Sequence, residues 1–158
     1  YAAEHTDINF VVAPDSYAAG TIAKEVKLLA KSDFNKHISV YGQAYIVCRE
    51  TETEAKEYLD YYVNERGDQD GVENLLDILI PNSKSALDTG WRAMADNMIA
   101  GYGAIPLVGT PEQVVDGMRA FSDNGIDGIT LSWVDYKAGL SQFESDILPL
   151  MREAGLRQ

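Results

Sequence analysis

The sequence predicts an α/β protein built on a parallel sheet. Short apolar runs alternate with amphipathic helical segments along the 158 residues. The runs are apolar at nearly every position, which is typical of parallel strands covered on both faces. The chain is long enough for one domain with a sizeable core. Its net charge of −12 disfavours nucleic acids and anionic membrane surfaces as partners.

The first two strands and the helix between them follow from apolar spacing. The run Ile8-Asn9-Phe10-Val11-Val12 ends at Ala13-Pro14-Asp15 and predicts a strand over 8–12. Residues 18–31 place apolar side chains three and four positions apart, which predicts an amphipathic helix. The nearly continuous apolar stretch from His37 to Arg49 then predicts a second strand.

Two helix starts carry explicit capping signals. Thr51 and Glu54 have the spacing of a capping box, and the helix is expected to run from about Glu54 to Arg66. Later, a brief strand at 107–108 leads to Thr110 as N-cap, Pro111 in the first helical position and Gln113 three residues after the cap.

The remaining segments complete the alternation. We interpret residues 67–103 as an insertion, with an apolar patch at 72–80, a break at 81–83 and a helix over 85–100. Asn124-Gly125 ends the helix that begins at Pro111, and residues 128–133 form a further strand. A final helix over about 139–154 should be kinked or shortened by Pro149.

This order of elements fits two architectures. One is a doubly wound sheet of four strands, although no glycine-rich dinucleotide fingerprint follows the first strand. The other is the later half of an eight-stranded β/α barrel, a fold that needs about 250 residues. In the second case the four strands are neighbours in an incomplete ring.

Functional side chains in parallel α/β folds gather where strands end and helices begin. Gln43 and Tyr45 are two apart on a strand, so they share a face and could orient a polar ligand, or Tyr45 is an ordinary core tyrosine. Trp133 either stacks on a planar ring or caps the end of the core. The other residues at strand ends or beside the insertion are Asn9, Phe10, Arg49, Tyr102 and Ser132.

The residues alone indicate no reaction. Arg49 is expected to be a solvated charge, and Cys48 a small buried apolar side chain rather than a nucleophile. His5 and His37 lie outside any metal-ligand spacing, and a single cysteine forms neither an internal disulfide nor a multi-thiolate site. The cysteine content makes the cytoplasm the expected location. No run is long enough to predict a membrane span.

Several segments together resemble one enzyme family. The segments 47–55, 107–115, 124–131 and 143–155 resemble, in order and spacing, the C-terminal part of bacterial luciferase-like, flavin-dependent monooxygenases. Within that family the likeness is greatest to the group of alkanesulfonate, dimethyl-sulfone and pyrimidine monooxygenases. Ser132-Trp133-Val134-Asp135-Tyr136 is most similar to the sulfone and pyrimidine enzymes.

The resemblance implies a fold and a reaction. The fold is the C-terminal half of a (β/α)8 TIM-type barrel, with the insertion at 67–103 acting as a lid. The reaction uses reduced FMN (FMNH2) from a separate flavin reductase and O2, and oxygenates a small organosulfur or heterocyclic substrate through a flavin peroxide. Gln43, Tyr45, Tyr102 and Trp133 would bind the substrate, and Asn9, Phe10 and Ser132 the cofactor. No catalytic residue is assigned and no metal is expected.

The chain also departs from the family pattern. Gln43 and Tyr45 stand where alkanesulfonate enzymes carry an Arg and a His, and residues 101–106 lack those enzymes' arginine, which disfavours a sulfonate substrate. The segment that resembles the family's FMN phosphate site would precede Tyr1. We therefore expect this chain alone to bind FMN weakly or not at all, and either to self-associate as a homo-oligomer or to belong to a longer protein.

Two other functions stay open. A non-catalytic barrel remnant or assembly subunit would also lack the phosphate segment. A related deazaflavin-dependent reductase would share the barrel and the Gly109-Thr110-Pro111 helix start.

Overall fold

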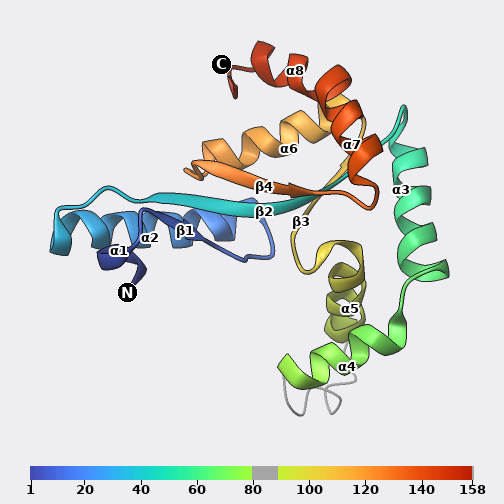
Figure 1. Cartoon of the computed structure of the whole chain (residues 1–158), viewed down its shortest axis with the longest axis horizontal. Coiled ribbons are helices and arrows are strands. Elements are labelled where there is room, and N and C mark those ends of the chain that lie inside the picture. The colour runs from blue at the N-terminus through green and yellow to red at the C-terminus, as the bar shows by residue number, and fades with distance from the viewer. Residues whose placement is uncertain (80–88, 158) are drawn as a thin grey trace.

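The computed structural model describes residues 1–79 and 89–157, which form a parallel sheet flanked by helices (Figure 1). The strands are β1 (Ile8–Phe10), β2 (Ser39–Cys48), β3 (Ile105–Gly109) and β4 (Gly128–Ser132). The helical elements are α1 (Ala2–His5), α2 (Ser16–Phe34), α3 (Glu52–Asp60), η1 (Tyr61–Glu65), α4 (Gln69–Leu79), α5 (Thr89–Gly101), α6 (Pro111–Asp123), α7 (Tyr136–Gln142), η3 (Phe143–Ile147) and α8 (Leu148–Glu153).

The long strand β2 is the centre of the sheet and pairs with the three other strands, all in parallel. Tyr41 pairs with Phe10 of β1 and with Gly128 of β4. Ala44 likewise pairs with Ile105 of β3 and with Leu131 of β4. A strand residue has one neighbour on each edge, so β4 lies along one edge of β2, while β1 and β3 follow each other along the opposite edge.

This topology confirms a parallel α/β sheet, but its strand order differs from the one expected for consecutive neighbours in a ring. Four neighbouring strands in an incomplete ring would place β3 between β2 and β4, whereas β4 pairs directly with β2. The run of neighbours is therefore β1, β2, β4, with β3 added beside the carboxyl end of β2. The half barrel that the resemblance implied is not established by these pairings.

Helices cover one face of the sheet and form the main core with it. In β2 this face carries Val40, Ala44, Ile46 and Cys48, all 4% exposed or less. The helices contribute residues from α2, α6 and η3, and the carboxyl-terminal helices pack above β4 and β2 in Figure 1. Phe121 of α6 packs so close to Gly42 that a Cβ on that glycine would lie 2.8 Å from its ring. We call this side of the sheet the covered face.

The two predicted capping boxes are confirmed. Glu54 N–H donates to Thr51 Oγ1 over 3.2 Å, and Thr51 N–H donates to Glu54 Oε2 over 3.1 Å. Thr110 and Gln113 make the same reciprocal pair at the start of α6. The final helix is interrupted before Pro149: α7 begins at Tyr136, earlier than predicted, and passes into the π-helical segment η3 before α8 begins at Leu148.

Helices α4 and α5 form an arm beside the sheet (Figure 1). Val72, Leu76 and Ala95 make a separate small core between them. This arm falls in the predicted insertion, although the break at 81–83 and the region 80–88 lie outside the described residues. Over residues 1–79 and 89–157, no helix has the length and apolar character needed to cross a membrane.

Candidate functional site

The face of the sheet opposite the main core is only partly covered: α3, η1 and α5 bury Tyr45 and Val47 towards the carboxyl end of β2, and the rest of the face is more exposed. Its residues alternate with the buried ones along the strands, and we call the set Ile8, Phe10, Tyr41, Gln43 and Thr130 the open face. Phe10 is 53% exposed and Ile8 is 45% exposed. The Phe10 and Tyr41 rings meet edge to face, with centroids 5.7 Å apart. Exposed apolar surface of this kind marks a binding surface or a contact with further protein.

Towards the carboxyl end of β2 the open face leads into a pocket of 330 Å³, which we call the aromatic pocket. It is lined by Tyr45, Ile46, Tyr62, Met98, Ile99, Ala100, Gly101, Tyr102, Ser132, Trp133 and Val134. Four predicted site residues, Tyr45, Tyr102, Ser132 and Trp133, therefore lie together. A pocket of this size at the carboxyl ends of parallel strands suits a small ligand.

Two tyrosines hold the last turn of α5 against this pocket. Tyr45 is 5% exposed, and a Cβ on Gly101 would lie 2.2 Å from its ring. Only glycine therefore allows α5 to approach β2 this closely. Tyr62 of η1 donates its phenol O–H to the Ala100 carbonyl over 3.1 Å.

Burial sets the protonation of these phenols. Burial raises the pKa of Tyr45. Burial, together with the neighbouring Tyr45 and Tyr58 hydroxyls, raises the pKa of Tyr62 well above its ordinary value. Both groups therefore stay protonated at neutral pH, where they donate hydrogen bonds and do not act as bases.

Trp133 lines the pocket and also caps the core. A Cβ on Gly139 would lie 2.4 Å from the indole, and the Phe143 ring meets it edge to face at 6.0 Å. The indole Nε1 is buried and has no hydrogen-bond partner in the described part of the chain. An unsatisfied buried donor of this type has a free energy cost of about 1–3 kcal/mol.

The other predicted residues are dispersed. Gln43 lies on the open face, two residues before Tyr45 in β2. Phe10 lies on the same face, in β1, where it pairs with Tyr41 of β2. Asn9 pairs with Val40 and therefore belongs to the covered side of the sheet, away from Phe10 and Ser132. The sequence interpretation missed Tyr41, which its two-residue spacing from Gln43 would have identified, and Tyr62, whose helical spacing indicated only burial.

A second pocket of 570 Å³ lies between the end of β2, Tyr58 of α3 and the α7–η3 segment. Arg49 lines it, with its guanidinium carbon 3.9 Å from the centre of the Tyr58 ring. Arg49 also donates from Nη1 to the Cys48 carbonyl over 2.7 Å, so it is held in place rather than freely solvated. Cys48 is 1% exposed, and burial followed by the charge of Asp146 raises the pKa of its thiol to about 11. Such a thiol is not an activated nucleophile.

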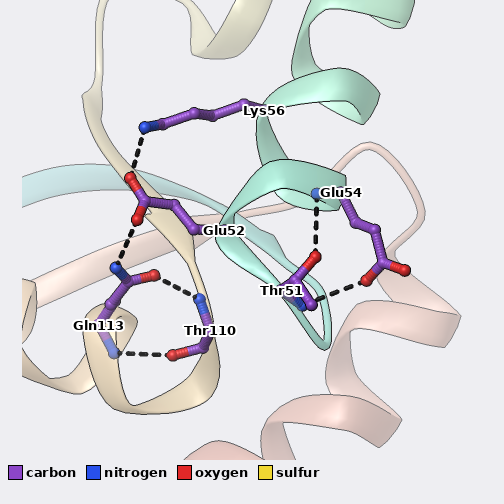
Figure 2. A network of polar contacts seen from close by, with 6 residues as sticks. All are labelled: Thr51, Glu52, Glu54, Lys56, Thr110 and Gln113. Carbon is purple, nitrogen blue, oxygen red and sulfur yellow. Dashed lines mark hydrogen bonds and ion pairs between the residues drawn. The ribbon is translucent and has the colours of Figure 1, made fainter.

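Figure 2 shows how the two capping boxes are joined. Gln113 Oε1 accepts from Thr110 N–H, and its Nε2 donates to Glu52 Oε2 over 3.0 Å. The other oxygen of Glu52 pairs with Lys56. The pKa of Glu52 is lowered by the hydrogen bond from Lys56 and then by that from Gln113. The network ties the start of α3 to the start of α6 across the carboxyl ends of β2 and β3.

A comparison with protein families identifies the chain's relatives. The model of the luciferase-like monooxygenase family matches residues 1–128. The chain belongs to the luciferase-like monooxygenase family.

Curated members of the family are similar over most of this luciferase-like chain. The pyrimidine monooxygenase RutA of Klebsiella pneumoniae (strain 342) is 27% identical over an alignment of 159 positions that covers 96% of this chain and 43% of that protein. RutA of Acinetobacter baylyi is 27% identical over an alignment of 158 positions that covers 96% of this chain and 42% of that protein. The chain thus spans about two fifths of the length of these relatives.

Solved structures support the fold. DmoA from Hyphomicrobium sulfonivorans superposes with a TM-score of 0.82 at 18% identity, over 99% of this chain and 39% of that one. Riboflavin lyase RcaE, solved with modified FMN and riboflavin, superposes with a TM-score of 0.79 at 16% identity, over 99% of this chain and 41% of that one.

The described residues of this luciferase-like chain do not fit the phosphate of FMN. Phosphates commonly bind at helix N-termini, but the helices that follow the four strands are capped by their own side chains. These caps are Asp15, Thr51, Thr110 and Asp135. Glu52, Glu54 and Glu112 add negative charge in the first turns of α3 and α6. The aromatic side chains of the open face and of the aromatic pocket are suited to a planar ring instead. No cluster of three or more His, Cys, Asp or Glu that could hold a metal occurs within residues 1–79 and 89–157.

Proposed function

We propose that this chain is part of an FMNH2-dependent monooxygenase that oxygenates a small organosulfur or heterocyclic substrate with O2. The observation that carries the proposal is the open face, which leads into the aromatic pocket at the carboxyl ends of β2 and β4 in a luciferase-like chain. Further strands laid against the free edges of β1 and β4 would close a (β/α)8 barrel around the open face. That closure would give the ring system and the substrate a shared, water-poor site.

The chain's own residues have distinct tasks in this proposal. Gln43 offers an amide donor and acceptor on the open face, and Ser132 offers a hydroxyl opposite Tyr45 in the β2–β4 pairing. Both can orient a polar edge of a bound molecule. Tyr45, Tyr102 and Trp133 supply aromatic walls that exclude water, which protects a reactive oxygenation step. Reduced FMN supplies, when bound, the electrons that activate O2.

The predicted cofactor contacts lie on different faces of the sheet. Phe10 and Ser132 lie on the face that would meet the flavin ring, so they remain the proposed cofactor contacts. Asn9 lies on the covered side and would act only through the position of β1. The phosphate would be bound outside the described residues. A separate flavin reductase, a homo-oligomeric assembly and the lid role of the α4–α5 arm belong to this proposal as well.

Coupling of O2 use to product tests the role of Trp133. In Trp133→Ala the pocket wall opens to water, so we expect O2 consumption to continue while product per O2 falls about tenfold. Oxygen uptake and product mass spectrometry with reduced FMN measure this ratio. Tyr136→Ala is the matched control, because Tyr136 contacts the Trp133 ring edge to face at 5.8 Å without lining the aromatic pocket. Unchanged coupling in Trp133→Ala would contradict this placement.

A non-catalytic, barrel-derived subunit is the second candidate. The self-capped helix starts favour it, since they leave no phosphate site among the described residues. Titration of the intact natural chain with reduced FMN separates the two functions. Stoichiometric binding supports the monooxygenase, and absence of binding supports the subunit.

A further inference from the structure

Helix α5 ends in a conformation that rarely accommodates tyrosine. Tyr102 has a φ of 56°, in the left-handed region. Its N–H donates to the Met98 carbonyl over 2.8 Å, which is the hydrogen bond of a left-handed helix cap. Glycine normally occupies this position, because a Cβ clashes with the backbone there. Tyr102 is therefore a strained residue between two glycines, Gly101 and Gly103.

Packing does not compensate this strain. The Tyr102 side chain is 68% exposed, so its ring gains little from burial. Tyr102 is thus largely exposed, although it is one of the residues that line the aromatic pocket. Strained residues that the fold does not need cluster at ligand sites. The position of Tyr102 therefore indicates a role in binding rather than in stability.

The backbone before Tyr102 is held in place by two contacts. The turn before it is held by the contact of Gly101 with Tyr45 and by the hydrogen bond from Tyr62 to the Ala100 carbonyl. Both contacts anchor the end of α5 to the pocket wall. The left-handed turn then places Tyr102, which lines the aromatic pocket, directly after this anchored segment.

The chemistry of the pocket selects the ligand. Among its described lining residues there is no Lys, Arg, His, Asp or Glu. Three phenols and an indole provide apolar faces and a few hydrogen-bond donors. A charged ligand would lose its hydration here without gaining an opposite charge, whereas an uncharged ring would lose little.

We propose that Tyr102 is a specificity-determining residue, held over the aromatic pocket to contact an uncharged aromatic or apolar ligand. This inference rests on the proposed function and names the ligand class of the same site. It predicts that one substitution, Tyr102→Gly, should raise the thermal stability of the chain and weaken ligand binding.

The test uses three probes of similar size that differ in charge: benzamide, benzoate and benzylamine. Calorimetric titration of the intact natural chain should show benzamide binding more tightly than the other two. In Tyr102→Gly the benzamide Kd should rise about tenfold, while Tm rises by about 2–4 °C because the strain is removed. In Tyr102→Phe, which keeps the ring and the strain, both values should stay near those of the parent chain.

Asn35→Gly is the matched control for strain. Asn35 also has a left-handed φ, of 47°, at the end of α2, and it does not line the aromatic pocket. Its replacement should leave the benzamide Kd unchanged. An unaltered Kd in Tyr102→Gly, an unaltered or lower Tm, or equal binding of the three probes would overturn the inference. The titration contains no flavin, so failure of FMN-dependent O2 uptake would refute the proposed function without changing this readout.

Discussion

The two faces of the sheet are made by alternating residues of the same strands, yet they differ in composition. On β2 the covered face presents Val40 and Ala44, which are 0% and 1% exposed, and the open face presents Tyr41 and Gln43, which are only partly buried. The covered face is packed with small aliphatic side chains against helices. The open face carries aromatic and amide groups that stay partly exposed. The first face holds the fold together, and the second remains available for binding.

Truncating one phenylalanine on each face of the sheet should give the largest difference in stability. Phe121 is 1% exposed in the core of the covered face, so Phe121→Ala should lower the free energy of unfolding by about 3–5 kcal/mol. Phe10 is 53% exposed on the open face, so Phe10→Ala should lower it by less than about 1 kcal/mol. Urea unfolding of the 158-residue chain measures both. Equal losses would show that the open face is covered in solution.

The ion pair between Lys27 of α2 and Asp127, beside the covered face, should have a smaller effect on stability. Asp127 Oδ2 lies 2.6 Å from Lys27 Nζ and accepts from Val40 N–H over 2.7 Å. Burial alone would raise the pKa of Asp127, but the hydrogen bonds from Lys27 and Val40 outweigh it and the pKa is lowered. Asp127→Asn keeps an accepting oxygen and loses the charge, so we expect a loss of about 1 kcal/mol at pH 7 after allowing for screening.

The stability that Asp127 contributes should depend on pH. The folded pKa of Asp127 lies below its unfolded value of about 3.9, so its charge stabilises the fold above that pH. This stabilisation disappears as the pH falls through the folded pKa. Thermal unfolding of the parent chain and Asp127→Asn should therefore converge in acid. A gap that persists below pH 2 would show that the amide disturbs packing.

The network of Figure 2 gives the smallest effect, at the carboxyl ends of the strands. Gln113→Glu keeps the acceptor for Thr110 N–H but replaces the donor to Glu52 with a second carboxylate. The repulsion should lower Tm slightly at neutral pH and vanish below about pH 4, when the carboxylates become protonated. Adding Glu52→Gln should restore the parent Tm. If it does not, the network of Figure 2 does not link the two helices in solution.

Local signals in the sequence predicted the elements well. Two helix starts were identified from a threonine followed three residues later by Glu or Gln, at Thr51 and at Thr110. This signal is reliable because a capping box is formed within four residues. The apolar run of β2 identified its central strand for the same reason. The amphipathic pattern that predicted a helix over 18–31 was only partly correct about burial. Its apolar positions include Ile22 and Leu29, which are 36% and 46% exposed, whereas the buried side chains of α2 are its alanines.

Features that depend on distant contacts could not be predicted. The pairing of β4 with β2 joins residues about 87 positions apart in sequence, as Val40 and Asp127 are, and no local pattern distinguishes it from pairing with β3. The meeting of Tyr45, Tyr102 and Trp133 was foreseen only from their places at element ends. The left-handed backbone of Tyr102 had no sequence signal, because the residue usually found there is glycine.

The contact between Tyr45 and Gly101 has a consequence for anyone who wishes to redesign the pocket. Randomising position 101 alone should return glycine, because the tyrosine ring already occupies the space of any larger residue. A library that varies both positions together could exchange the large and small partners. The large side chain would then lie on α5 and the small one on β2, and the cavity would change shape while its volume was conserved.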